Sequence, residues 1–341
     1  MKMKGHWLLT ALLILTASVN AQWIKQTVNT TASFRGLSVI NEKVIWASGT
    51  GGTVIRTTDG GKSWNVITVP GAEKLDFRDI EAFDANTAYI LSIGNGGSSR
   101  IYKTADGGKT WKLQFKNTNE KAFFDAMACT DRNRCIAMSD PVDGKFLLIV
   151  TTDSGGTWIV DPKVTGSPTA KQGEAAFAAS GTCLILVPPL GFMIVSGGNT
   201  ARVFRSVFND TGGMDWPVSE PLFVKGTSGS GIFSIAMFDK TNGVIVGGNY
   251  EKPEDAKDNL AFTTDSGNTW KLGTGLSGYR SGVTYVDKNT IVAVGTNGSD
   301  ISRDGGKTWK ILGEEDLNAV QAKGKKAVWA VGPKGGVYKM K

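Results

Sequence analysis

Histidine is nearly absent from this sequence, because the single copy, His6, lies within the first ten of 341 residues. A chain with no other histidine excludes Ser-His-Asp and Cys-His catalysis, HExxH zinc sites and histidine metal ligands. The sequence also lacks a dinucleotide fingerprint, a haem-attachment CxxCH and any cysteine spacing typical of a metal site. We therefore expect neither a metal nor a cofactor.

Cysteine is scarce too, with three copies in the chain. Cys129 and Cys135 enclose the segment CTDRNRC at a predicted turn, which favours a local disulfide in an oxidising compartment. Cys183 remains unpaired in an apolar run, where we expect a buried, inert thiol.

Long apolar runs are missing except near the start, where Leu8–Val19 follows two lysines and precedes a small-x-small site ending at Ala21. That run is too short to span a bilayer comfortably and is typical of a secretory signal. We predict a signal peptide over 1–21 and a mature chain over 22–341. The predicted location is extracytoplasmic, either periplasmic or secreted.

The charge has no clustering of one sign. The formal net charge of +7 falls to +5 without the two lysines of the predicted signal, and the remaining lysines are spread along the chain. This pattern indicates a solvated surface, and we expect no nucleic-acid partner.

What the sequence has in abundance is one octapeptide: Ser/Thr, any residue, Asp, a small residue, Gly, any residue, Ser/Thr, Trp. Its aspartates are Asp59, Asp106, Asp153, Asp265 and Asp304, and its tryptophans are Trp64, Trp111, Trp158, Trp270 and Trp309. Each copy separates two short apolar runs, which predicts a hairpin turn whose Asp bonds its own backbone and whose Gly supplies a positive φ. The Trp would begin the return strand and fill space between packed sheets.

The octapeptide resembles the Asp-box, or bacterial neuraminidase repeat, of sialidases and related β-propellers. In those folds the box lies between the third and fourth strands of a blade and is structural. The aspartates here are 47, 47, 112 and 39 residues apart. Blades recur about every 40–45 residues, so the long gap predicts a degenerate copy, which we place at Ala201–Trp216.

Each repeat unit can be read as four strands. In this reading 157–161 (TWIVD) is the fourth strand of blade three, and 173–179 (GEAAFAA) is the first strand of blade four. The C-terminal unit has only three strands, and Gln22–Thr27 (QWIKQT) matches the missing fourth. We predict an all-β, seven-bladed β-propeller forming one domain over 22–341, with the last blade closed by the N-terminal strand.

Polar residues open the first strands of several predicted blades, and these openings should surround one end of the central channel. They are Arg35, Arg78, Asp79, Asp125, Glu174, Tyr279 and Arg280. Loops on the same face add Asp140, Asp143, Asn199, Asn249, Tyr250 and Lys334. Two interpretations remain open: a structural ion-pair network, or a pocket in which arginines grip an anionic or polyhydroxyl ligand.

The mature chain resembles the photosystem II stability/assembly factor-like family, on the blade count, the boxes and stretches such as FRDIEAFDANTAYILSIG, SDPVDG and GEAAFAASGTC. The resemblance implies a non-catalytic, monomeric binding, scaffold or assembly factor for an envelope or membrane protein complex. Those relatives present an arginine-rich patch to their partner, for which Arg35, Arg78 and Arg280 are the candidates here. Nothing in the chain indicates photosynthesis, so that specific role does not transfer.

The alternative hypothesis is a sialidase-like glycoside hydrolase acting on an acidic glycan, a reaction that needs no histidine. Arg35, Arg78 and Arg280 would then bind the substrate carboxylate. The remaining roles would fall to Tyr279 with Glu174 as nucleophile pair, and to Asp125 or Asp79 as acid/base. Three observations oppose this hypothesis. Sialidases usually have six blades, and their N-terminal arginine motif is absent from this sequence. Tyr279 and Arg280 are adjacent, so on one strand their side chains would point to opposite faces.

Overall fold

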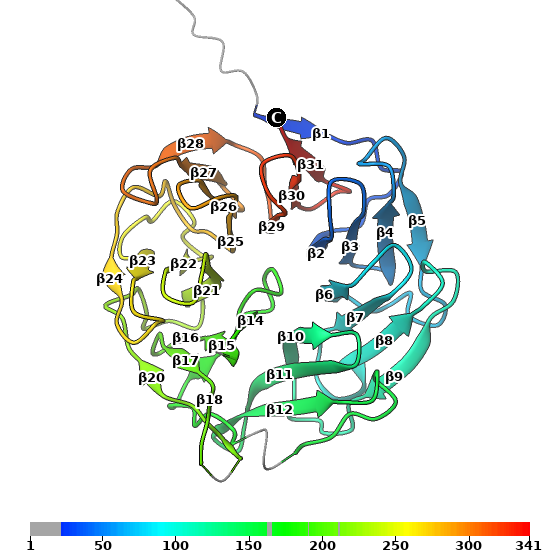
Figure 1. The fold of residues 1–341 in the computed structure, drawn as a ribbon, viewed down its shortest axis with the longest axis horizontal. Coiled ribbons are helices and arrows are strands. Elements are labelled where there is room, and N and C mark those ends of the chain that lie inside the picture. Colours follow the sequence, from blue (N-terminus) through cyan, green and yellow to red (C-terminus); the bar gives the residue numbers. More distant parts are fainter. Residues whose placement is uncertain (1–21, 162–165, 190, 211) are drawn as a thin grey trace, which may run out of the picture.

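The computed structural model describes residues 22–161, 166–189, 191–210 and 212–341, and the predicted signal peptide lies outside them. In this part of the chain, antiparallel sheets are arranged as seven blades around a common centre, which confirms the predicted fold (Figure 1). None of its helices has the length and apolar character needed to cross a membrane.

The strands follow the chain from blade to blade. Blades one and two contain β2 (Phe34–Val39), β3 (Ile45–Gly49), β4 (Thr53–Thr57) and β5 (Asn65–Thr68), then β6 (Phe77–Ala82), β7 (Ala88–Ser92), β8 (Arg100–Thr104) and β9 (Lys112–Lys116). Blades three and four contain β10 (Phe124–Asp131), β11 (Arg134–Val142) and β12 (Lys145–Thr151), then β14 (Leu184–Val187), β15 (Gly191–Val195), β17 (Val203–Arg205) and β20 (Val218–Ser219).

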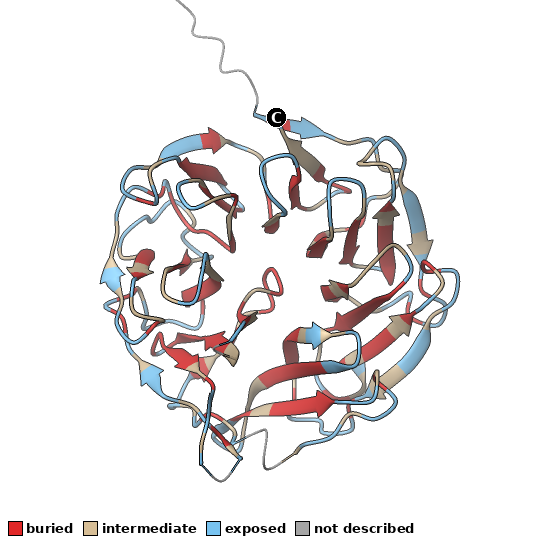
Figure 2. Cartoon of the chain, in the orientation of Figure 1, coloured by how far each residue is buried: buried red, intermediate tan, exposed pale blue. Residues whose placement is uncertain are grey.

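The remaining blades have the same organisation. Blades five and six contain β21 (Ser230–Met237), β22 (Gly243–Asn249), β23 (Leu260–Thr263) and β24 (Lys271–Leu272), then β25 (Gly282–Tyr285), β26 (Ile291–Gly295), β27 (Gly298–Ser302) and β28 (Lys310–Gly313). Blade seven contains β29 (Ala319–Ala322), β30 (Val328–Val331), β31 (Val337–Met340) and β1 (Trp23–Lys25). The inner strands of the blades are largely buried, whereas outer strands such as β5 and β9 are exposed (Figure 2).

The N-terminal strand closes the ring, as predicted. β1 pairs antiparallel with β31, with Trp23 opposite Met340. The Trp23 side chain is buried, and its indole Nε1 donates a hydrogen bond to Ser299 Oγ of blade six, 3.0 Å away. This pairing gives the last blade its fourth strand and covers the edge of β31 that would otherwise be open.

The octapeptides form the predicted turns between third and fourth strands. In the second copy, Asp106 Oδ1 accepts hydrogen bonds from Thr104 Oγ1 and Thr110 N, and Asp106 Oδ2 accepts from Thr110 Oγ1. Thr104 Oγ1 accepts in turn from Gly108 N, and Gly107 and Gly108 have φ of 79° and 85°. The other four copies repeat these bonds.

The octapeptide tryptophans pack against the preceding blade. Trp64 of blade one meets Trp329 of blade seven edge-on, with ring centroids 5.7 Å apart. Trp158 of blade three meets Tyr89 of blade two in the same way, at 6.3 Å. The repeated turn therefore serves both to reverse the chain and to join neighbouring sheets.

Blade four begins later than predicted. Its inner strand is β14, and the segment 173–179 contributes only β13 (Glu174–Ala175), which pairs with β16 (Gly197–Gly198) at the edge of the blade-five sheet. The predicted segment is mostly alanine, whereas β14 reads LILV and has the apolar, partly β-branched composition that packs well in a sheet. Residues 176–182, which we name the central loop, instead enter the centre of the ring (Figure 1).

Two outer elements also differ from prediction. The fourth strand expected at 157–161 is reduced to one bridge between Val150 and Ile159. The degenerate octapeptide at 201–216 is replaced by a short hairpin, β18 (Val207–Phe208) with β19 (Met214–Asp215), because its aspartate is out of register with the others.

The predicted cysteine pairing and the predicted burial of the third cysteine are present in the structure. Cys129 and Cys135 form a disulfide across the β10–β11 hairpin. Cys183 is a free thiol with no exposed surface, and burial raises the pKa of this thiol well above its usual value.

Candidate functional site

A β-bulge recurs at the start of four inner strands. In each strand one residue lies between two consecutive register partners and has no partner of its own, so its side chain is aimed out of the regular pleat. These residues are Arg35, Arg78, Asp125 and Phe233. Each follows Phe or Ile and precedes Gly, Asp, Ala or Ser, a triplet pattern that is visible in the sequence.

Two of the bulge residues, Arg35 and Arg78, place their guanidinium groups near each other. Arg35 Nη1 donates to the carbonyl of Ala179 at 3.1 Å, and Arg78 Nη1 donates to the carbonyl of Ala178 at 3.3 Å. Arg78 also pairs with Asp76, with Nε to Oδ2 at 2.8 Å. The pKa of Arg35 is lowered by burial and by the neighbouring charge of Arg78, so the two guanidinium groups repel each other.

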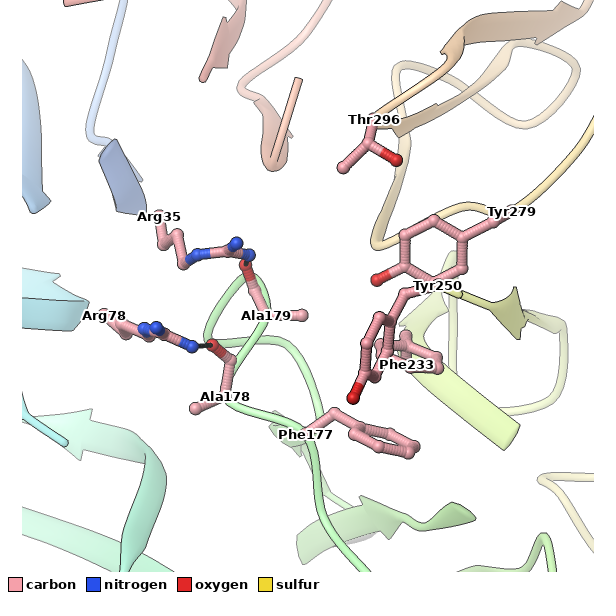
Figure 3. A pocket seen from close by; sticks show the side chains of 9 residues that line it. All are labelled: Arg35, Arg78, Phe177, Ala178, Ala179, Phe233, Tyr250, Tyr279 and Thr296. Atoms are coloured by element: carbon pink, nitrogen blue, oxygen red, sulfur yellow. Dashed lines mark hydrogen bonds between the residues drawn. The ribbon is translucent and has the colours of Figure 1, made fainter. Parts of the chain in front are cut away.

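An aromatic wall, formed by Phe177, Phe233, Tyr250 and Tyr279, faces the arginines. Phe177 and Phe233 stack with centroids 3.8 Å apart and an interplanar angle of 5°. Phe233 also meets Tyr279 edge-on at 4.8 Å and Tyr250 at 6.3 Å. The hydroxyl of Tyr279 points across towards the arginine side (Figure 3).

Together these groups line a pocket of about 310 Å³, completed by Ala178, Ala179 and Thr296. The pocket has a cationic side from blades one and two and an aromatic side from the central loop and blades five and six (Figure 3). The pKa of the Tyr279 hydroxyl is raised by burial, an effect that the positive charge of Arg35 partly offsets. An electrostatic environment of this kind favours an anionic ligand.

The central loop is held by contacts with several blades. Ala176 N donates to Asp140 Oδ1 at 2.8 Å, and Ser180 Oγ donates to the carbonyl of Ser281 at 2.7 Å. The hydroxyls of Thr182 and Ser234 are 2.6 Å apart. These bonds, with those from the two arginines, connect the loop to blades one, two, three, five and six.

Carboxyl groups lie beneath the loop rather than around the pocket. Asp79 accepts hydrogen bonds from Ile80 N and Met127 N, and burial raises its pKa to about 7. Burial likewise raises the pKa of Asp140 to about 6. Asp125 is 1% exposed, its pKa is raised well above the usual range by burial and by Asp140, and its Oδ2 has no hydrogen-bond partner among the described residues. The prediction that Asp79 and Asp125 face a ligand is therefore wrong.

Arg280 is also wrongly predicted as a ligand-binding residue. Its side chain has no exposed surface and pairs with Asp300, with Nη2 to Oδ2 at 2.6 Å. The remaining donors reach Ser277 Oγ, Asn297 Oδ1 and the carbonyl of Tyr279. Tyr279 faces the pocket and Arg280 faces away from it, as expected for adjacent residues of an extended chain.

Glu174 and Asp143 lie away from the pocket as well. Glu174 is buried, and its carboxylate is bound by the guanidinium of Arg202 and by Ser196 Oγ. Asp143 sits at the exposed turn between β11 and β12, where it pairs with Lys121. Of the residues predicted around the channel mouth, Arg35, Arg78, Tyr250 and Tyr279 line the pocket. The sequence reasoning missed Phe177, Phe233 and the two alanine carbonyls.

The fold is similar to those of several solved structures. A structure of "YCF48 bound to D1 peptide" matches with a TM-score of 0.66 and 17% identity, covering 94% of each chain. The chain has the fold of YCF48. YCF48 from Cyanidioschyzon merolae matches at 0.59 and 17%, covering 94% of this chain and 99% of that one. The WD40 propeller of Doa1 matches at 0.59 and 9%, covering 94% and 97%.

The predicted resemblance to the photosystem II assembly factor propellers is thus confirmed at the level of fold. No family model matches the sequence, and no curated protein matches it either. The catalytic set of the sialidase hypothesis is not assembled. Arg280 is sealed in an ion pair and Glu174 is bound to Arg202, while Tyr279 lines a pocket that Glu174 does not.

Proposed function

We propose that this protein is an extracytoplasmic, non-catalytic binding propeller, and that it recognises a polypeptide segment of an envelope or membrane protein complex at the Arg35/Arg78 pocket. The observation that carries the proposal is the pair of neighbouring guanidinium groups, which repel each other, whereas Asp76 and Asp316 act on Arg35 only from beyond ion-pair distance. Among the described residues, Arg35 makes no ion pair, and its hydrogen-bond acceptor is a neutral carbonyl. Such a site gains most from an incoming carboxylate.

The fold supports this proposal in two ways. YCF48, which shares the fold, was captured with a D1 peptide. The pocket also lies on loops and bulges held by a rigid ring, which is where scaffolds of this type carry binding residues. The secretory signal predicted over 1–21 supports the extracytoplasmic location.

Affinity purification from the native cell envelope tests the proposal, using the mature chain with a C-terminal tag. We expect the wild type to retain a defined membrane or envelope complex, and Arg35→Ala/Arg78→Ala to lose it. Arg303→Ala is the matched control, because Arg303 is exposed and belongs to a different surface. Equal capture by the double variant would place the interface elsewhere, and the absence of any complex with the wild type would contradict the binding role.

A further inference from the structure

The pocket has a cationic wall and an aromatic wall, and it is small enough for a single residue to touch both. We propose that it selects a carboxylate carried by, or directly next to, an aromatic residue, with the carboxylate on Arg35 and Arg78 and the ring on the aromatic wall. This inference rests on the proposed function and specifies the ligand chemistry of the same pocket.

The cationic side is occupied by weak acceptors that a ligand can replace. The carbonyls of Ala178 and Ala179 accept from the arginines at 3.3 and 3.1 Å, at the long end of hydrogen-bond distances. Hydrogen bonds between guanidinium and carboxylate are shorter and roughly twice as strong. A carboxylate entering the pocket therefore takes the Nη donors from the central loop, while Asp76 continues to hold Arg78 Nε.

The aromatic side of the pocket can bind an apolar ring in addition to the anion. Tyr250 is 49% exposed and Phe177 is half-buried, so both offer ring surface, whereas Phe233 and Tyr279 behind them are buried. A ligand ring can stack on Phe177 or meet Tyr250 edge-on, as Phe233 already does. A small inorganic anion would reach the arginines and leave this apolar surface wet.

The dimensions fit one residue of a chain. A volume of about 310 Å³ is at the lower end of the roughly 300–1,000 Å³ typical of ligand pockets. The required chemistry has two sources: a chain that ends in an aromatic residue, or an acidic side chain next to an aromatic one inside a chain.

Calorimetric titration of the mature protein with four probes distinguishes these possibilities. N-acetylphenylalanine represents an aromatic chain terminus, and N-acetyl-Asp-Phe-amide represents an internal acid beside a ring. N-acetylphenylalanine amide lacks the carboxylate, and N-acetylglycine lacks the ring. We expect at least one aromatic acid to bind about tenfold more tightly than the amide and roughly three- to tenfold more tightly than N-acetylglycine.

Variants assign the two contributions. Arg35→Ala should abolish binding of every acid. Tyr250→Ala should weaken the aromatic acids and leave N-acetylglycine unchanged, whereas Phe208→Ala, which removes an exposed ring on the β18–β19 hairpin, should change nothing. The proposal would be overturned if neither aromatic acid binds more tightly than N-acetylphenylalanine amide, or if neither binds more tightly than N-acetylglycine. If affinity purification still captured a complex that depends on Arg35 and Arg78, the proposed function would stand and only the ligand chemistry proposed here would fail.

Discussion

Arg280 Nη2 and Asp300 Oδ2 form an ion pair 2.6 Å apart, and 0% and 1% of their side-chain surfaces are exposed. Arg280 precedes β25, whereas Arg35 is the bulge residue of β2; Arg35 lines the pocket and meets no carboxylate within ion-pair distance among the described residues. The two arginines therefore have different surroundings: Arg280 is enclosed in an ion pair, and Arg35 lines the pocket.

Replacing Arg280 should destabilise the fold strongly. Arg280→Met leaves Asp300 buried without its partner, and losing one member of a buried pair typically costs about 3–5 kcal/mol. Urea unfolding measures this loss of unfolding free energy. Arg35→Ala is the comparison, because it removes a half-buried arginine without an ion pair and should cost about 1 kcal/mol or less. Similar losses for the two variants would contradict the division of roles.

Closure of the ring by the N-terminal strand predicts a large effect at its first residue. Trp23 is 4% exposed and its indole donates to Ser299, so Trp23→Ala should reduce the free energy of unfolding by about 3–5 kcal/mol. The adjacent Ile24 is 46% exposed, and Ile24→Ala should be within about 0.5 kcal/mol of wild type. Thermal and urea unfolding of both variants compare them directly, and equal effects would argue against closure by β1.

The octapeptide turns should make stability depend on pH in acid. Hydrogen bonds from the side chain and backbone of Thr110 lower the pKa of Asp106 to about 2, below the value near 4 of an unfolded chain. A depressed pKa contributes stability that is present above pH 4 and is lost as pH falls towards 2. Asp106→Asn should therefore be less stable than wild type at pH 7, and the difference should narrow between pH 4 and pH 3.

The control for this experiment is Glu254→Gln, an exposed carboxyl outside the turns. It should follow wild type at every pH. A difference between Asp106→Asn and wild type that stays constant down to pH 3 would show that the charge of Asp106 does not stabilise the turn.

Asp125 should have the opposite dependence on pH. Its pKa is raised by burial and by Asp140, with Arg78 opposing the shift, so the folded protein keeps a proton that the unfolded chain releases above pH 4. The wild type therefore loses stability as pH rises from 4 towards the folded pKa. Asp125→Asn removes this penalty and should be more stable than wild type at pH 8 and equal to it near pH 4. Unfolding free energies at both pH values decide the matter, and a variant that is less stable at pH 8 would refute the argument.

Much of the architecture could be predicted because the signals are local. The Asp, Gly and Ser/Thr residues of each octapeptide satisfy one another within five residues, so the turns can be recognised without tertiary information. The error at 173–179 arose because a short alanine-rich stretch beside a genuine strand has no clear period. Its course through the centre is decided by contacts with residues as distant as Arg35 and Ser281.

The sequence by itself determined the repeated turns, the blade count, the closing strand and the disulfide, since each depends on spacing and on neighbours along the chain. Only the tertiary structure decided which polar residues are available. In the sequence, Arg280, Glu174, Asp79 and Asp125 are polar residues at predicted blade starts, just as Arg35 and Arg78 are. Whether each is buried depends on partners that are distant along the chain. The aromatic wall likewise depends on Phe177 of the central loop stacking on Phe233 of blade five, which is far from it in the sequence.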